Sequence, residues 1–293
     1  MIAQQWRGSV AVATDGGPVE DGHGFGHAFL MAHDSPSINA DPHSADARGP
    51  IGQAVTHVLD LLLPPQCLNC GCIVETTGAL CAPCWEQVSF LTSPFCACCG
   101  LPFEEDAGTD ALCGACHRAR PAYQRARAVM IYDEASRHMI LAYKHGDRTD
   151  MAPAFAAWAA RAGGDLIADA DLIAPVPLHW TRLFRRRFNQ AALIARHLSA
   201  DGGQKFAPDL IVRKRRTPSQ AGLGFGGRRR NVRGAFRAAA KWRSRLAGKR
   251  VLLIDDVMTT GATVSSCARV LTRAGASAVD VLTLARVVRP QPE

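Results

Sequence analysis

The chain has 293 residues and a mass of 31.4 kDa, a length that corresponds to one to three domains. Hydrophobic residues make up 47% and charged residues 20%, which suits a folded core and excludes wholesale disorder or a collagen-like chain. No apolar run reaches the ~18 residues that a membrane helix needs, and residues 1–30 lack the basic start and apolar stretch of a signal peptide. We therefore expect a cytoplasmic protein with no membrane insertion.

Charge is distributed unevenly along the chain. The formal net charge is +8, but residues 1–60 carry −5 and residues 182–250 carry +18. Such a basic stretch favours a polyanionic partner, either nucleic acid or a phosphate-rich small molecule. The alternative is an arginine-rich face that is simply solvated.

The N-terminal part is rich in Gly, Asp, His, Ser and Pro. Residues 1–50 show neither helical nor strand periodicity, which predicts a disordered leader, and Met31 is an alternative start of the protein. Residues 51–63 have the pattern of a short amphipathic helix that ends at Pro64 and Pro65. We expect a first folded domain over residues 51–120 and a second over residues 121–293.

Ten of the eleven cysteines lie between Cys67 and Cys116, and eight of them form four CxxC pairs. In a cytoplasmic chain disulfides are reduced, so metal binding is favoured. Two CxxC pairs complete the closed tetrahedral thiolate shell of a structural zinc ion. Paired in chain order, the expected ligands of two Zn²⁺ ions are Cys67, Cys70, Cys81 and Cys84 for the first, and Cys96, Cys99, Cys113 and Cys116 for the second.

Some features of the cysteine region leave alternatives open. Cys72 and Cys98 are left over, and each could replace a neighbouring ligand. An iron–sulfur cluster and redox disulfides are the rivals of zinc. Gly71 and Gly100 each follow a CxxC pair, where such turns often need a positive φ. Cys267 stands alone at a core-type helix position and is expected to be a packing residue.

From about residue 121, helical patterns alternate with short β-type runs. Asn189 is expected to cap a helix, and the run at 251–254 is apolar throughout, as in a strand buried on both faces. This order predicts an α/β fold with a parallel sheet flanked by helices. The expected helices are 134–144, 151–162, 189–200 and 262–274, and the expected strands are 171–175, 210–212, 251–254 and 278–285.

The sharpest motif follows the strand at 251–254, which ends in Asp255 and Asp256. A loop of threonines and glycine then opens a helix. Amides at a helix start favour an anion, Gly261 permits close approach, and the hydroxyls add donors. The residues that can cradle a phosphate are Thr259, Thr260, Gly261, Ala262 and Thr263.

The two carboxylates lie at the carboxyl end of a parallel strand, where α/β sheets bind ligands. Asp255 and Asp256 suit vicinal sugar hydroxyls and can help to hold Mg²⁺. The loop is not a Walker A sequence, because no Gly-Lys-Ser/Thr follows. The alternative interpretation is a strand–turn–helix with incidental threonines.

The loop resembles the 5-phosphoribosyl-1-pyrophosphate (PRPP) motif of type I phosphoribosyltransferases. From about Val55 onward the chain resembles the ComF family, which includes GntX-type proteins. That family joins an N-terminal double zinc ribbon to a type I phosphoribosyltransferase-like domain. The other matching positions are a lysine-containing helix end at 142–147, the PVPL loop at 175–179, Arg182, Arg186, the FNQ triplet at 188–190, Gln220, Arg228, Asn231, Val232, Gly234, Ala235 and Phe236.

The resemblance implies roles for these residues. Asp255 and Asp256 would contact the ribose hydroxyls of PRPP, and residues 259–263 would bind its 5-phosphate. The loop formed by Pro175, Val176, Pro177 and Leu178 would face the pyrophosphate. Residues 220–231 would form a mobile loop that closes over the site, and Arg228 would bring positive charge to the leaving group. The alternative is an ordinary flexible, arginine-rich loop.

The sequence also departs from the family pattern at one position. Arg187 stands where the family has glycine before the FNQ triplet. If that glycine needs a positive φ, Arg187 strains the loop. The alternative is that Arg187 adds one more phosphate contact.

By resemblance the chain binds PRPP with Mg²⁺ and transfers a phosphoribosyl group with release of pyrophosphate, in connection with DNA uptake (natural competence). The alternatives are a non-catalytic single-stranded DNA-binding or competence accessory protein, and a PRPP sensor. The expected partners are PRPP, single-stranded DNA and competence proteins. Aromatic residues are sparse in the basic stretch, which is thin for a base-stacking platform.

Overall fold

The computed structural model describes residues 64–145, 148–202, 205–215 and 225–288. The chain divides into two units, Met1–Ile51 and Gly52–Glu293, and every described residue belongs to the second. The expected leader at 1–50 and helix at 51–63 therefore lie outside the described residues. Within the described part of the chain, no helix has the length and apolar character needed to cross a membrane.

The cysteine region is built from short turns and two short helices, α2 (Ala82–Gln87) and α3 (Gly114–Arg118). Isolated antiparallel bridges join Gln66 to Ile73 and Phe95 to Pro102. The expected positive φ is confirmed at Gly71 (+78°) and Gly100 (+69°). These left-handed glycines let the chain turn back immediately after each CxxC pair.

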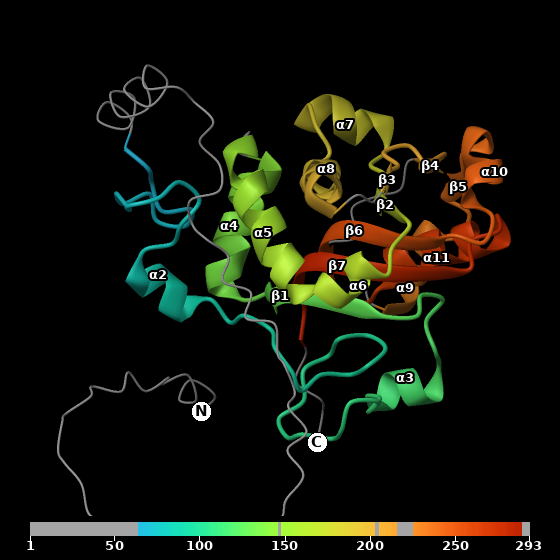
Figure 1. Cartoon of the computed structure of the whole chain (residues 1–293), viewed down its shortest axis with the longest axis horizontal. Helices are drawn as coiled ribbons and strands as arrows, with labels where there is room; N and C mark the ends of the chain where they lie inside the picture. Colours follow the sequence, from blue (N-terminus) through green and yellow to red (C-terminus); the bar gives the residue numbers. More distant parts are fainter. Residues whose placement is uncertain (1–63, 146–147, 203–204, 216–224, 289–293) are drawn as a thin grey trace, which may run out of the picture. The chain divides into compact units, whose positions relative to one another are not determined.

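Five parallel strands form the main sheet. This confirms the prediction of an α/β fold with a parallel sheet (Figure 1). Ile254 pairs with Pro175 on one side and Leu282 on the other, so the carboxyl ends of the central strands lie together. In spatial order the strands are β1 (Ala126–Ile131), β7 (Ala278–Arg286), β6 (Arg250–Met258), β2 (Leu172–Pro175) and β3 (Lys205–Phe206).

Helices cover both faces of the sheet. One core forms between the sheet and four helices, namely α4 (Glu134–His145), α5 (Ala152–Ala162), α6 (Gly164–Ala168) and α8 (Gln190–Gly202). The other core forms against α11 (Ala262–Arg273). Leu252 and Ile254 enter the first core, whereas Val251 and Leu253 enter the second. The all-apolar run is therefore a strand buried on both faces, as expected.

The expected helices are present with small shifts at their ends. A short 3₁₀ turn, η1 (Thr149–Met151), precedes α5 and moves its start to Ala152. Asn189 caps α8 as expected, because its Oδ1 accepts a hydrogen bond from the amide of Ala191 at 3.1 Å. Cys267 is fully buried in α11, as expected for a packing residue.

A separate two-stranded antiparallel sheet lies outside the main one. The strand expected at 210–212 is β4 (Ile211–Arg213), which pairs with β5 (Phe236–Ala238) rather than with the parallel sheet. A short apolar run does not reveal which neighbour it pairs with. After β5 the chain forms η2 (Ala240–Trp242) and α10 (Arg243–Leu246).

The prediction of a loop at 220–231 is wrong for its second half, because residues Phe225–Val232 form helix α9. This helix contains an Arg-Arg-Arg run and little apolar periodicity, so its sequence pattern is weak. Residues 220–224 lie outside the described residues.

Candidate functional site

Each of the two expected cysteine quartets comes together, with its sulfur atoms within 4.8 Å of one another. We call the quartet Cys67, Cys70, Cys81 and Cys84 the first cluster, and the quartet Cys96, Cys99, Cys113 and Cys116 the second cluster. Cys72, which is exposed, and Cys98, which is buried, belong to neither. Four converging thiols with no other ligand fit the closed shell of a structural zinc ion.

Backbone amides support the thiolate form of the first cysteine in each cluster. Cys67 Sγ accepts from the amide of Cys81 at 3.4 Å, and Cys96 Sγ accepts from the amides of Cys99 at 3.5 Å and Cys113 at 3.3 Å. Burial raises both pKa values, but these amide donors outweigh it and lower the pKa of Cys67 to about 6 and of Cys96 to about 7. Thiolates are the form that binds metal.

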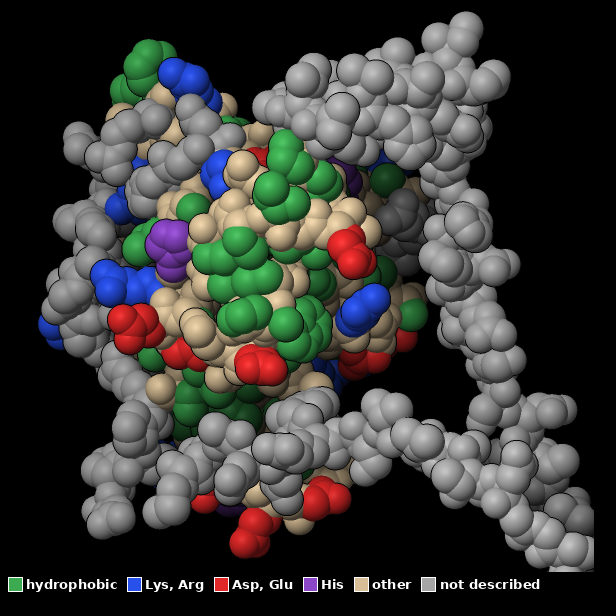
Figure 2. Space-filling model, turned by 90° about the vertical axis from the view of Figure 1, so that its left-hand side faces the viewer, with side chains coloured by type: hydrophobic (Ala, Val, Ile, Leu, Met, Phe, Trp, Pro, Cys, Tyr) green, Lys and Arg blue, Asp and Glu red, His purple; other side chains and the backbone are tan. Residues whose placement is uncertain are grey.

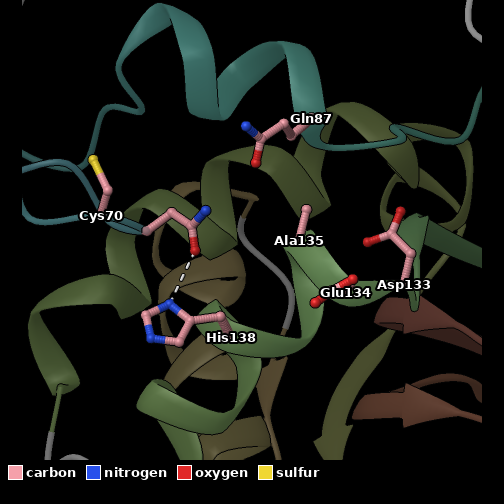
Figure 3. Close-up of a pocket in the computed structure, with 7 residues that line it drawn as sticks. Cys70, Gln87, Asp133, Glu134, Ala135 and His138 are labelled. Atoms are coloured by element: carbon pink, nitrogen blue, oxygen red, sulfur yellow. Dashed lines mark hydrogen bonds between the residues drawn. The ribbon is translucent and has the colours of Figure 1, made fainter.

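The first cluster packs beside α4. Asn69 Oδ1 lies 3.0 Å from Nδ1 of His138, and an open hollow of about 610 Å³ lies between this turn, the end of α2 and the start of α4. Figure 3 shows Cys70, Gln87, Glu134 and His138 around it. Figure 2 shows one face of the molecule, on which hydrophobic side chains gather with single acidic and basic residues at the edge.

The second cluster packs against the end of the main sheet. The carbonyl of Cys98 accepts from the amide of Ala126 in β1 at 2.7 Å. From β7, Arg286 donates Nη2–H to Cys99 Sγ at 3.4 Å and Nη1–H to the carbonyl oxygen of Cys99. Nothing in the sequence singles out Arg286, because it lies 187 residues from Cys99.

The threonine loop lies between the end of β6 and the start of α11. Gly261 precedes the helix with φ +68°, and a Cβ there would lie 3.2 Å from the hydroxyl oxygen of Tyr123. Both the left-handed conformation and this close approach require glycine. The buried Oγ1 of Thr260 has no hydrogen-bond partner. Unpaired buried hydroxyls are costly, so this atom fits a ligand oxygen at the helix start.

Asp255 and Asp256 lie inside β6, which runs on through Val257 and Met258 to the loop, so the strand is longer than the expected 251–254. Asp255 Oδ1 accepts from the amide of Asp256 at 2.9 Å, and Asp256 Oδ2 lies 3.0 Å from Nζ of Lys144 in α4. Burial, with the neighbouring Asp256 charge, raises the pKa of Asp255 to about 7, although Lys144 and Arg213 oppose the shift. Near neutral pH the two carboxyl groups together therefore carry one negative charge more readily than two.

The loop after β2 lies next to the acidic pair. Pro175, Val176 and Pro177 are buried, and the amide of Val176 donates to the carbonyl of Ile254 at 2.8 Å. The Nδ2 of Asn189 donates to the carbonyl of Val176 at 3.0 Å. These two hydrogen bonds hold the start of the loop against β6 and α8.

The FNQ triplet links this loop to α4. Gln190 Nε2 donates to the carbonyl of Lys144 at 3.1 Å, and the hydroxyl of Tyr143 donates to the carbonyl of Gln190 at 2.9 Å. These contacts fix Lys144 beside Asp256. The sequence pattern predicted the cap at Asn189 but not the contacts of Gln190 with α4.

Arg187 has φ +63°, and it is the only non-glycine residue with a positive φ in the part of the chain that the structure describes. It ends α7 (Trp180–Arg186) in the left-handed conformation, where glycine is the usual residue. The strain expected at this position is therefore present.

Two further arginines lie in β4 and α9. Arg213 in β4 was not singled out by the sequence, yet it is buried and its Cζ lies 5.2 Å from the ring centre of Phe236. Burial lowers its pKa, with the nearby Arg182 adding to the shift. Arg228 lies in α9, and its side chain is outside what the structure describes.

Helix α7, which follows the loop after β2, carries large exposed apolar side chains. Trp180 is 70% exposed, Leu183 42% and Phe184 86%. They recur at helical spacing on a helix that also contains Arg182 and Arg186. The sequence alone does not predict this arrangement, because it does not show which aromatic residues remain on the surface.

Known protein families match both the cysteine region and the α/β part of the chain. A double zinc ribbon domain matches residues 58–117, and a phosphoribosyl transferase domain matches residues 200–292. The chain is thus a double zinc ribbon joined to a phosphoribosyltransferase fold. It is 32% identical to DNA utilization protein YhgH of Salmonella typhi, over 78% of this chain and 100% of that protein. It is 29% identical to Competence protein F of Haemophilus influenzae, over 75% of this chain and 96% of that protein. The chain belongs to the ComF family, which these relatives represent.

Solved structures give a weaker likeness. The allosteric regulatory enzyme of purine biosynthesis matches 49% of this chain and 30% of its own at 20% identity, with a TM-score of 0.31. TT1426 from Thermus thermophilus matches 48% of this chain and 86% of its own at 16% identity, with a TM-score of 0.29. Nothing about function follows from likenesses at this level.

Proposed function

We propose that the carboxyl end of β6 binds PRPP together with Mg²⁺ and transfers its phosphoribosyl group. The observation that carries the proposal is the position of Asp255 and Asp256 in the carboxyl-terminal half of β6, ahead of a loop that opens α11 through left-handed Gly261. The buried hydroxyl of Thr260, which has no hydrogen-bond partner, can donate to a ligand oxygen. A phosphate at a helix start and a ribose on a carboxylate pair fit this arrangement.

Each part of the ligand has a counterpart in the chain. Residues 259–263 would hold the 5-phosphate, and Asp255 and Asp256 would accept from the ribose hydroxyls. The backbone of the loop at 175–178 would face the pyrophosphate, with Arg228 brought in from α9. Mg²⁺ would neutralise part of the charge on the pyrophosphate.

The chemistry would be a displacement at C1 of the ribose. The bond from C1 to the pyrophosphate oxygen would break with its electron pair on that oxygen, the bond from C1 to the acceptor nucleophile would form, and the acceptor's proton would pass to the released pyrophosphate or to water. Such a reaction needs positioning and charge stabilisation more than a single general base. Lys144, held by its ion pair with Asp256 at 3.0 Å, would fix the orientation of that carboxylate.

The names of the relatives suggest the setting. They are called competence protein and DNA utilization protein, so we place this activity in DNA uptake, with single-stranded DNA and competence proteins as partners.

The test is a calorimetric titration of PRPP with Mg²⁺ into the zinc-loaded chain. We expect saturable binding that is lost in the Asp255→Asn, Asp256→Asn double variant. Asp110→Asn, which changes an exposed carboxylate in the cysteine region, serves as the control and should bind like the wild type. Pyrophosphate release with a panel of acceptors then tests turnover. Absence of binding to the wild type would overturn the proposal.

A second candidate function, single-stranded DNA binding, is favoured by helix α7. Trp180 and Phe184 are 70% and 86% exposed, and arginines flank them. Exposed aromatic rings stack on bases, and arginines attract the backbone. We expect Trp180→Ala, Phe184→Ala to weaken binding of a labelled oligothymidine by about tenfold or more in fluorescence anisotropy. Trp85→Ala, which removes another exposed tryptophan, is the control, and an equal loss there would reject α7 as the platform.

A further inference from the structure

Arg286 connects the second cluster to the strand that carries the phosphate loop. It is the last residue of β7 and is only 9% exposed. Its Nη2–H donates to Cys99 Sγ at 3.4 Å, and its Nη1–H donates to the carbonyl of Cys99. The same Nη1 lies 4.0 Å from Sδ of Met258, the residue directly before Thr259. One guanidinium thus contacts both a metal ligand and the base of the loop.

The charge of Arg286 fits a metal-loaded cluster. Four thiolates around a zinc ion carry two net negative charges, and a buried guanidinium that donates to one thiolate offsets part of them. Among the residues that the structure describes, no carboxylate forms an ion pair with Arg286. Its counter-charge is therefore the second cluster itself, and a buried arginine without a counter-charge is strongly unfavourable.

Contacts continue from Met258 into the loop. Met258 pairs with Arg286 in the β6–β7 register, and its Sδ accepts from the hydroxyl of Tyr123 at 4.0 Å. Tyr123 in turn leaves no room for a side chain at Gly261, where a Cβ would lie 3.2 Å from its hydroxyl oxygen. Met258 and Tyr123 are 2% and 6% exposed, so the whole path from Cys99 to Gly261 is buried.

A second contact joins the same segment to α11. The amide of Ala122 donates to Oγ of Ser265, in the first turn of the helix, at 3.2 Å. The residues between α3 and β1 therefore pack beneath the helix start. The first cluster has a different attachment, through Asn69 and His138 of α4.

We propose that Arg286 is a positioning residue through which a metal-loaded second cluster holds the phosphate loop in its binding geometry. Loss of the metal would free Cys99 from its cluster, so Arg286 would lose its fixed partner and Met258 and Tyr123 would lose their support. The loop would then loosen. The ligand-binding consequence rests on the proposed function above, whereas the loosening of the loop does not.

The experiment compares Arg286→Met with His138→Ala in the zinc-loaded full chain. His138→Ala is the matched control, because it cuts the corresponding contact of the first cluster. Hydrogen exchange of residues 258–264 should become about tenfold faster in Arg286→Met and stay unchanged in His138→Ala. In Arg286→Met, zinc release to a chromogenic chelator should accelerate for one of the two ions. Arg286→Lys, which keeps the charge but loses the fork of donors, should give an intermediate exchange rate.

A further measurement covers the case in which Arg286→Met does not fold. The wild type is treated with a chelator under reducing conditions, and loop exchange is followed while zinc leaves. We expect the loop to loosen in step with release from the second cluster, as read from exchange of residues 96–100. Unchanged loop exchange in folded Arg286→Met, or in wild type that has lost this metal, overturns the proposal.

The two proposals fail separately. Wild type that binds no PRPP but whose loop loosens in Arg286→Met would refute the proposed function and support the role of Arg286. Wild type that binds PRPP, with loop exchange and affinity unchanged in Arg286→Met, would support the function and refute that role.

Discussion

The two cysteine clusters share a ligand set and nearly the same spacing, yet the rest of the chain surrounds them differently. In the first cluster Cys70 is exposed and Cys81 partly exposed, whereas all four cysteines of the second are buried. Leu68, beside the first cluster, packs in the core under α5 and α8, and the second cluster packs in the core on the α11 face. The same motif therefore gives a peripheral site on one face and, on the other, a site continuous with the phosphate loop.

This difference shows that a metal motif specifies its ligands but not its importance to the fold. The ligands are set by local turns at Gly71 and Gly100. Dependence of the fold on the metal is set by what packs around the sulfur atoms. We expect experiments that remove matching groups from the two clusters to have unequal effects.

The largest difference is expected from removal of one ligand. Cys99→Ser should destabilise the chain by at least about 3 kcal/mol, because it removes a buried ligand and leaves Arg286 without its thiolate partner. Cys70→Ser should cost clearly less than Cys99→Ser, because that position is exposed. Urea unfolding with parallel zinc analysis measures both. Equal losses of unfolding free energy in the two variants would contradict the expected difference between the clusters.

A smaller but cleaner difference is expected from the turn glycines. Gly71 and Gly100 have φ of +78° and +69°, so alanine strains both turns by about 1 kcal/mol. A Cβ at Gly100 would also lie 2.5 Å from the carbonyl oxygen of Ala126, whereas a Cβ at Gly71 would meet no atom within 4 Å. We expect Gly100→Ala to cost about 2 kcal/mol more than Gly71→Ala. Equal midpoints in thermal unfolding would contradict the close packing of the second turn on β1.

The acidic pair beside the loop gives a pH signature that neither cluster shares. The pKa of Asp255 is raised to about 7 in the folded chain, above its usual value near about 4. The folded state therefore keeps a proton that the unfolded state releases, and this contribution to stability is lost as pH rises from about 4 through about 7. The melting temperature of wild type relative to Asp255→Asn should fall by about 5 °C over that range. Parallel curves between about pH 5 and about pH 8 would refute the raised pKa.

The smallest effect concerns thiol reactivity in chain stripped of metal. The pKa of Cys70 is lowered, chiefly by the backbone amide of Cys72, and this thiol is exposed. Iodoacetamide should label Cys70 about tenfold faster than Cys99 under native conditions. Peptide mass spectrometry after short reaction times reads the ratio, and equal labelling would show that the second cluster opens as readily as the first.

Features that depend on neighbouring residues were predictable. The CxxC spacing identified both quartets, and the run from Val251 to Thr263 predicted a strand, a loop and a helix in the correct order, although β6 continues past the acidic pair to Met258. Helix periodicity found α4, α5, α8 and α11. The strand at 210–212 was found, but its partner was not, because pairing depends on residues that return from far along the chain.

Features that depend on distant residues were not predictable. Arg286 reaches Cys99 across 187 positions, and no local pattern marks it. The ion pair between Lys144 and Asp256 depends on how Gln190 holds the end of α4. The exposure of Trp180 and Phe184 is likewise a result of packing, because helical spacing alone fits either a core face or a surface.

The sequence by itself determined the ligands of both clusters, the parallel α/β architecture and the loop that opens α11, because each is encoded by residues within one or two turns of each other. Only the tertiary structure decided that the second cluster packs against the base of that loop while the first does not. The reason is that burial and counter-charge are properties of the assembled core, where β6, β7 and the second cluster meet.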